Sequence, residues 1–116
     1  MKYLFVLNDP PYGTERSYNG LRMAMSLSRR GESEVRLFLM ADAVSCAKTT
    51  QKTPAGYYNL ESMLKGLTHA KVPVGVCGTC IDARGISEAE LLQGVHRGSM
   101  DELTDWTVWA DKVVVY

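Results

Sequence analysis

Residues 74–86 read VGVCGTCIDARGI, an apolar run that leads directly into two cysteines. A proline precedes the run, and its compact β-branched residues are typical of the start of a strand buried on both faces. Cys77 falls where this strand ends. Gly78 and Gly85 bracket a predicted turn, because glycine lets backbone amides approach a ligand closely. The pattern therefore predicts a buried strand and a turn whose N–H groups can surround an anionic sulfur.

Upstream of this stretch, two apolar runs have the composition of central parallel strands. They cover residues 2–7 and 34–40. In the second run, Val35, Leu37 and Leu39 share one face, and Phe38 and Met40 share the other. Both faces of the predicted sheet are therefore buried.

Helical patterns separate these strands. Residues 15–30 place apolar side chains at helical spacing, with Thr14 as the predicted N-cap and Gly31 as the terminator. Residues 41–47 form a short helix or turn, and residues 48–58 lack either periodicity and are predicted to be a mobile loop. Such a loop in a small domain is more often functional than idle.

The second half of the chain repeats this alternation. Asn59 is the predicted cap of a helix over residues 60–70. Ser87 and Ser99 each begin a capping-box spacing, which predicts helices over residues 87–93 and 99–110. Short strands are expected near residues 95–96, as an alternative to a plain connection, and over residues 112–116.

Because strand and helix patterns alternate, the predicted fold is α/β: an open, mostly parallel sheet of about five strands, with helices on both faces in a flavodoxin-like layering. Residues 1–116 are expected to form one domain. In such sheets ligands bind beyond the carboxyl ends of the strands. Residues 8–14, 42–46 and 77–85 meet this rule, so we expect the site there.

The composition excludes some classes of partner. Thirteen basic and thirteen acidic side chains cancel, so the net charge gives no reason to expect binding to nucleic acid or a membrane surface. The apolar N-terminal run is interrupted at residues 8–11, too early for a signal peptide or a membrane span. Three cysteines form no disulfide framework, which favours a cytoplasmic protein with reactive or packed free thiols.

A cysteine nucleophile reacts as the thiolate, and an unperturbed thiol with a pKa of about 8.5 is largely protonated at neutral pH. The backbone amides of Gly78 and Thr79, with the Arg84 guanidinium, are the predicted groups that stabilise the anion. Asp82 is the alternative partner of Arg84. A zinc site is disfavoured because Cys46, His69 and His96 offer no second paired spacing, so no metal is expected. A thioredoxin-like dithiol is disfavoured because Gly85 follows Cys80 too soon for a long helix.

Several motifs resemble those of the DsrE/DsrF-like family, in order along nearly the whole chain. They are the Pro-x-Tyr-Gly-Thr motif at residues 10–14, the cysteine and Arg-Gly-Ile arrangement at residues 76–86, the Ser-Glu-x-Glu helix start at Ser87, and the Ala-Asp-Lys-Val-Val-Val ending. The resemblance implies a cysteine that carries sulfur as a persulfide, in subunits that assemble as trimers or hexamers. The family's cysteine falls on Cys77, whereas Cys80 departs from the pattern of the relay proteins.

Three functions are consistent with this sequence. The first is a sulfur carrier on Cys77 or Cys80, with sulfur donor and acceptor proteins as partners and no cofactor. The second is a thiol-disulfide redox protein or sensor that cycles a Cys77–Cys80 disulfide. The third is a noncatalytic oligomeric module that binds a small anion or nucleotide. The residues expected to support the site are Asn8, Tyr12, Gly13, Thr14, Cys46, Gly78, Thr79, Asp82 and Arg84.

Overall fold

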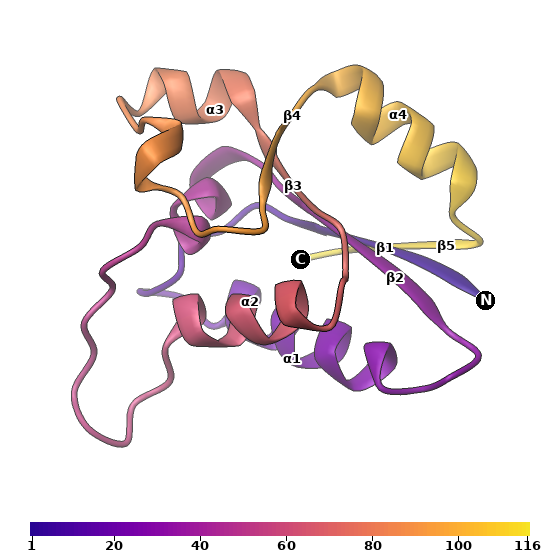
Figure 1. The fold of residues 1–116 in the computed structure, drawn as a ribbon, viewed down its shortest axis with the longest axis horizontal. Helices are drawn as coiled ribbons and strands as arrows, with labels where there is room; N and C mark the ends of the chain where they lie inside the picture. Colours follow the sequence, from indigo (N-terminus) through magenta and orange to yellow (C-terminus); the bar gives the residue numbers. More distant parts are fainter.

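The computed structural model describes residues 1–116 as a five-stranded, all-parallel sheet in the order β4-β3-β2-β1-β5 (Figure 1). The strands are β1 (Lys2–Leu7), β2 (Glu34–Leu39), β3 (Val74–Cys77), β4 (His96–Gly98) and β5 (Lys112–Val115). The predicted α/β class and parallel sheet are therefore confirmed. Strands β1, β2 and β3 each pair with a neighbour on both edges, and β4 and β5 are the edge strands.

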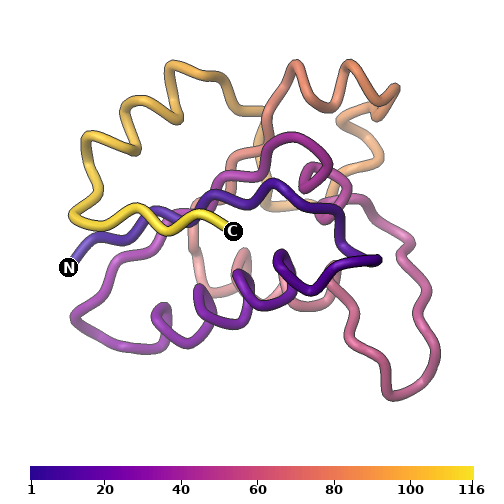
Figure 2. The backbone as a smooth tube through the Cα atoms, turned by 180° about the vertical axis from the view of Figure 1, so that it is seen from behind, coloured from indigo at the N-terminus to yellow at the C-terminus, as the bar shows by residue number.

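Four α-helices and two 3₁₀ helices connect the strands. They are α1 (Arg16–Ser28), η1 (Ala41–Ala47), α2 (Leu60–His69), α3 (Gly78–Ala83), η2 (Glu88–Glu90) and α4 (Met100–Trp109). Helices α1 and α2 lie together on one side of the sheet and α4 lies on the other, as both views show (Figures 1 and 2). The predicted layering with helices on both faces is confirmed.

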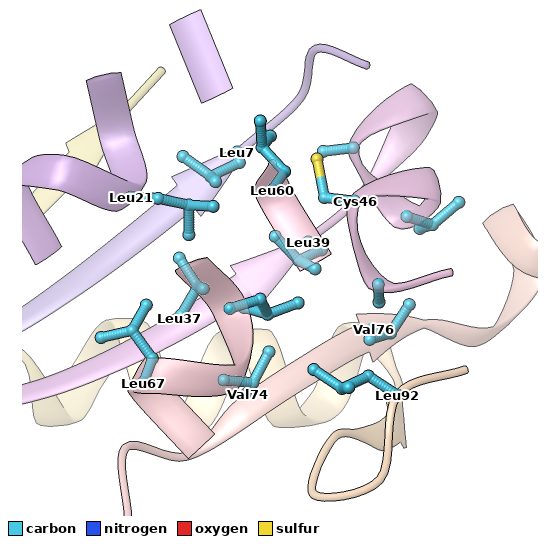
Figure 3. Close-up of a cluster of buried hydrophobic side chains, with 14 of the residues drawn as sticks. Leu7, Leu21, Leu37, Leu39, Cys46, Leu60, Leu67, Val74, Val76 and Leu92 are labelled. Carbon is cyan, nitrogen blue, oxygen red and sulfur yellow. The ribbon is translucent and has the colours of Figure 1, made fainter. Parts of the chain in front are cut away.

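The alternation of side chains along the central strands divides the core in two. Leu37 and Leu39 of β2 join the larger cluster beneath α1 and α2, together with Leu21 and Leu64 (Figure 3 shows part of it). Phe38 faces the other way, into a smaller cluster closed by Trp106 of α4. The two faces predicted for this strand are thus correct.

Several helix starts follow their predicted capping chemistry. The Asn59 side chain accepts a hydrogen bond from the Ser62 N–H, and Ser99 accepts one from the Glu102 N–H. Ser87 and Glu90 form the reciprocal capping box. Because each of these side chains satisfies a backbone donor that the helix leaves free, the sequence locates these helix starts correctly.

Three local predictions were wrong. Residues 78–83, expected as part of a turn, form α3, with Cys77 at the N-cap position. The helix expected over residues 87–93 is only the single turn η2, because the chain then extends and the Leu92 N–H donates to the Ala47 carbonyl oxygen at 2.8 Å. The N-cap of α1 is Glu15, and the Thr14 hydroxyl instead accepts the Arg16 N–H at 3.1 Å.

The loop between η1 and α2 has no helix or strand over residues 49–59 and projects from the body of the molecule (Figure 1). Its base is held by Gln51, whose amide nitrogen donates to the carbonyl oxygens of Cys46 and Lys48 at 3.0 and 2.9 Å. The Tyr12 hydroxyl donates to the Gln51 side-chain oxygen at 2.6 Å. Gln51 thus fixes the base of the loop to the end of η1 and to Tyr12.

None of the helices combines the length and apolarity that crossing a membrane would require. No three His, Cys, Asp or Glu side chains lie close enough together to hold a metal ion.

Candidate functional site

The loops that follow β1, β2 and β3 meet at the carboxyl edge of the sheet, as expected for parallel strands. The Ala43 N–H donates to the Asn8 carbonyl oxygen at 3.2 Å, which joins the first two loops. The Ala41 N–H donates to the Cys80 Sγ at 3.3 Å, which joins the second loop to α3. The cysteine pair therefore lies in a fixed position against η1.

Cys77 lies beside both a second thiol and a hydroxyl group. It is half-buried where β3 ends and α3 begins, and its Sγ lies 3.4 Å from the Thr79 hydroxyl. Partial burial alone would raise the pKa of Cys77. Hydrogen bonds from the Cys80 thiol, the Thr79 hydroxyl and the backbone N–H groups of both residues outweigh it and lower the pKa below its ordinary value.

Cys80 is affected in the opposite direction. Its burial and its hydrogen bond to Cys77 raise the pKa of the Cys80 thiol, although the Ala41 N–H and the Arg84 charge act against this rise. Cys77 is therefore the thiol that ionises first. Cys80 is the thiol that keeps its proton and donates it to the neighbouring sulfur.

Arg84 lies beside Cys80 rather than Cys77. Its guanidinium donates to the Asp42 carboxylate at 2.8 and 3.1 Å and to the Cys80 carbonyl oxygen at 3.1 Å. Asp42, not Asp82, is thus the carboxylate that pairs with Arg84. The charge of Arg84 still acts on the Cys80 sulfur through the short helix that separates them.

Arg97 is a site residue that the sequence did not reveal. It lies on β4, where it is paired in register with Val76, and both of its terminal nitrogens donate to the Asp82 carboxylate at 2.7 and 3.0 Å. These bonds hold the pKa of Asp82 below its usual range. A Cβ on Gly78 would lie 2.6 Å from the Arg97 Nε, so the guanidinium lies directly against the first residue of α3. The Cys77 sulfur in turn raises the pKa of Arg97, after the larger effect of Asp82.

The third cysteine does not join the pair. Cys46 is fully buried in the larger core cluster, where Figure 3 shows it beside Leu7 and Leu60. Burial raises the pKa of Cys46 to about 12. Its only hydrogen-bond acceptor outside its own loop is the Asp9 carbonyl oxygen, at 3.9 Å. Cys46 thus packs as a neutral apolar side chain.

The residues predicted from the first loop serve to anchor neighbouring segments. Asn8 donates to the Tyr116 carbonyl oxygen at 3.0 Å, and Thr14 donates to the Asp9 carboxylate at 3.0 Å. Tyr12 contacts the 49–59 loop, and Gly13 adopts a φ of 94° that favours glycine. None of these four residues forms a hydrogen bond with either sulfur of the pair. The surroundings of the two sulfurs are therefore formed by η1, α3 and β4.

The whole chain is similar to a described protein family and to solved structures. The model of the DsrE/DsrF-like family matches residues 1–116. Protein YchN of Escherichia coli strain K12 is 45% identical over 116 residues, covering 99% of this chain and 98% of that protein. Its crystal structure has a TM-score of 0.93 to this fold, with the same coverage.

Two further comparisons have lower sequence identity. Protein MJ0989 of Methanocaldococcus jannaschii is 34% identical over 116 residues, covering all of both chains. The structure of MTH1491 from Methanobacterium thermoautotrophicum is 13% identical with a TM-score of 0.80, covering 99% of this chain and 98% of that one. The latter likeness is one of fold alone.

Proposed function

Because this chain belongs to the DsrE/DsrF-like family, we propose that it is a sulfur carrier that holds sulfane sulfur as a persulfide on Cys77. The observation that carries this proposal is the set of donors around the Cys77 sulfur, which lowers its pKa while the sulfur stays partly accessible. A thiolate is the form that attacks another sulfur. Family membership supports this chemistry, because sulfur-relay proteins of the family carry sulfur on a cysteine.

The loading step transfers one sulfur atom without net oxidation. The Cys77 thiolate attacks the terminal sulfur of a donor persulfide, so a new S–S bond forms on Cys77 and the donor's own S–S bond breaks. The donor leaves as a thiolate. Attack of an acceptor nucleophile on the terminal sulfur reverses these changes and restores the Cys77 thiolate. No cofactor is required.

The persulfide adds one atom to the side chain and carries its negative charge at the outer sulfur. Around Cys77, the Thr79 hydroxyl and the N–H groups that begin α3 supply neutral donors. The Arg97 guanidinium, packed against Gly78, supplies a positive charge on the neighbouring strand. Charge-assisted hydrogen bonds of this kind are stronger than neutral ones, so we assign Arg97 the role of holding the outer sulfur.

The experiment uses cyanide, which removes sulfane sulfur as thiocyanate. A Cys80→Ser protein and a Cys77→Ser protein are each incubated with a cysteine desulfurase and cysteine, desalted and treated with cyanide. We expect one thiocyanate per chain from Cys80→Ser and none from Cys77→Ser. Equal yields from the two variants would contradict the assignment of the carrier to Cys77.

A redox function is the second candidate, and the opposite pKa shifts of the two thiols favour it. An ionised Cys77 paired with a protonated Cys80 is also the arrangement of a dithiol that exchanges disulfides. The reduction potential of the Cys77–Cys80 disulfide separates the candidates. A value near the cytosolic glutathione potential supports redox cycling, and a much lower value contradicts it.

We also propose that the carrier acts in the cytoplasm, where free thiols persist, with protein partners that supply and accept sulfur. A homo-oligomer, as a trimer or hexamer, is proposed on the basis of β5. This edge strand leaves Val113 and Val115 exposed at 44% and 64%. An uncovered apolar edge strand readily pairs or packs with another chain, and a second copy of this chain would cover it.

A further inference from the structure

The carrier cycle gives Cys80 no chemical step, although two groups that favour its thiolate act on its sulfur. The Ala41 N–H donates to the Cys80 Sγ at 3.3 Å. The Arg84 guanidinium, held by Asp42, lies one turn further along α3 and adds a positive charge. A thiol that only donated a hydrogen bond to Cys77 would need neither group.

The donor from η1 depends on an unusual backbone conformation. Ala41 has a φ of 52°, in the left-handed region that residues with a Cβ rarely adopt. The flanking backbone holds it there, because the Met40 N–H donates to the Leu7 carbonyl oxygen and the Ala43 N–H donates to the Met40 carbonyl oxygen, both at 3.0 Å. In this conformation the Ala41 N–H is directed at a sulfur instead of at a carbonyl oxygen.

We propose that Cys80 resolves the persulfide on Cys77 and releases its outer sulfur as hydrosulfide, a further activity that rests on the proposed function. The Cys80 thiol passes its proton to the outer sulfur of the persulfide anion, and the resulting Cys80 thiolate attacks the Cys77 Sγ. A Cys77–Cys80 disulfide forms, the bond between Cys77 and the outer sulfur breaks, and hydrosulfide leaves with the electron pair. The outer sulfur is reduced and the two cysteine sulfurs are oxidised, so no external oxidant is needed.

The local geometry supports attack on the inner sulfur. Cys77 occupies the N-cap of α3 and Cys80 its third residue, and each thiol affects the pKa of the other. The two residues therefore have the CxxC spacing in which neighbouring thiols form a disulfide. The Ala41 N–H and Arg84 stabilise Cys80 as it becomes the attacking anion. A dithiol reductant, either a small molecule or a protein, then restores the two thiols and completes a cycle that converts sulfane sulfur to sulfide.

The test compares the wild-type chain with Cys80→Ser under anaerobic conditions. Each reduced protein receives one equivalent of glutathione persulfide, with glutathione alone as the control. Free sulfide is measured by alkylation with a bimane reagent, and intact mass distinguishes persulfide from disulfide. We expect the wild type to yield one sulfide per chain and a Cys77–Cys80 disulfide, and Cys80→Ser to keep the added sulfur.

Each other outcome has a separate meaning. A stable persulfide on both proteins, without sulfide, would overturn the resolving role of Cys80 and leave the carrier intact. Sulfur moved to Cys80 without a disulfide would also overturn it. Absence of added sulfur in Cys80→Ser would instead count against the carrier itself.

Arg84 is a positioning residue in this step, and its role has a distinctive readout. Arg84→Gln, made with both cysteines intact, removes the charge beside Cys80. The pH profile of sulfide release from the persulfide-loaded variant should therefore move to higher pH. At pH 7 we expect release to slow by about threefold, as the thiolate fraction of Cys80 falls. Arg84→Lys restores the charge and should return the profile toward that of the wild type. A purely structural Arg84 would change the amplitude but not the midpoint of the profile.

Discussion

Arg97 and Asp82 form an ion pair next to the start of α3, where Cys77 lies. The Arg97 guanidinium lies against Gly78, while its terminal nitrogens are held by the Asp82 carboxylate. Asp82 therefore both positions the cation and reduces its net effect on the neighbouring sulfur. We expect the balance of this pair to modulate the pKa of Cys77, in addition to the hydrogen bonds from Cys80 and Thr79 that lower it.

This balance predicts opposite effects of two neutral substitutions. Arg97→Gln removes the cation and should slow alkylation of Cys77 by iodoacetamide at pH 7 by about threefold, because less thiolate is present. Asp82→Asn leaves the cation less compensated and should speed the reaction. The rates are measured by mass spectrometry of the Cys77 peptide, with the exposed Arg29→Gln as control. Changes of the same sign in both variants would refute the arrangement.

Cys46 gives a second prediction at this scale, on stability. Burial raises its pKa to about 12, so the native state keeps the thiol neutral where the unfolded chain, with a pKa near 9.0, ionises. The unfolded state then binds fewer protons, and stability falls as pH rises above 9. Between pH 8 and 10 the wild type should lose about 1.4 kcal/mol more than Cys46→Ala. Urea unfolding of the reduced proteins at both pH values measures this difference, and identical losses would contradict it.

At the scale of elements, the sequence was informative where a side chain acts on its own backbone. The caps at Asn59, Ser87 and Ser99 were predictable, because each depends on residues at most three positions away. Helix α3 was missed because it has six residues and only Ile81 and Gly78 are buried, so it has no apolar repeat. The period of a helix cannot be recognised over so short a segment.

The site shows the same limit for contacts between elements. Cys77 and Cys80 were predictable from their position after a strand. Arg97 was not, because its place beside Gly78 depends on the pairing of β3 with β4. The Ala41 N–H is a backbone group whose direction depends on a left-handed φ, and no side chain in the sequence marks it.

The loop between η1 and α2 carries a prediction of its own. Gln51→Ala removes four hydrogen bonds that its amide makes to Tyr12, Ser45, Cys46 and Lys48. Each bond contributes about 1 kcal/mol or less, so amide hydrogen exchange over residues 49–58 should accelerate by at least about tenfold. Lys52→Ala, one residue along the same loop, is the control and should leave exchange unchanged. Unaltered exchange in Gln51→Ala would show that Gln51 does not hold the loop.

At the scale of the whole molecule, the sheet is unevenly covered. Helices α1 and α2 bury one face, whereas on the other face Val113 and Val115 of β5 stay exposed beside Leu4 and Val6. The register places these four side chains on the same face. An apolar strip at the edge of a sheet is typical of a surface that a second chain covers.

Substitution in this strip should therefore change the assembly. Val115→Lys introduces a charge that a buried contact would have to desolvate, so we expect it to shift the oligomer toward the monomer by at least about tenfold in dissociation constant. Ser62→Lys, on the exposed surface of α2, is the matched control and should leave the mass unchanged. Light scattering after size exclusion gives the molar mass. A monomeric wild type would refute the proposed assembly.

Whether Cys77 carries sulfur is best tested by the intact mass of the reduced Cys80→Ser protein. After incubation with a cysteine desulfurase and cysteine, we expect the addition of one sulfur atom, located on the Cys77 peptide and lost on treatment with a reductant. A known sulfur acceptor, loaded in the same reaction, verifies that the donor is active. An unchanged mass beside a loaded acceptor would contradict the carrier function.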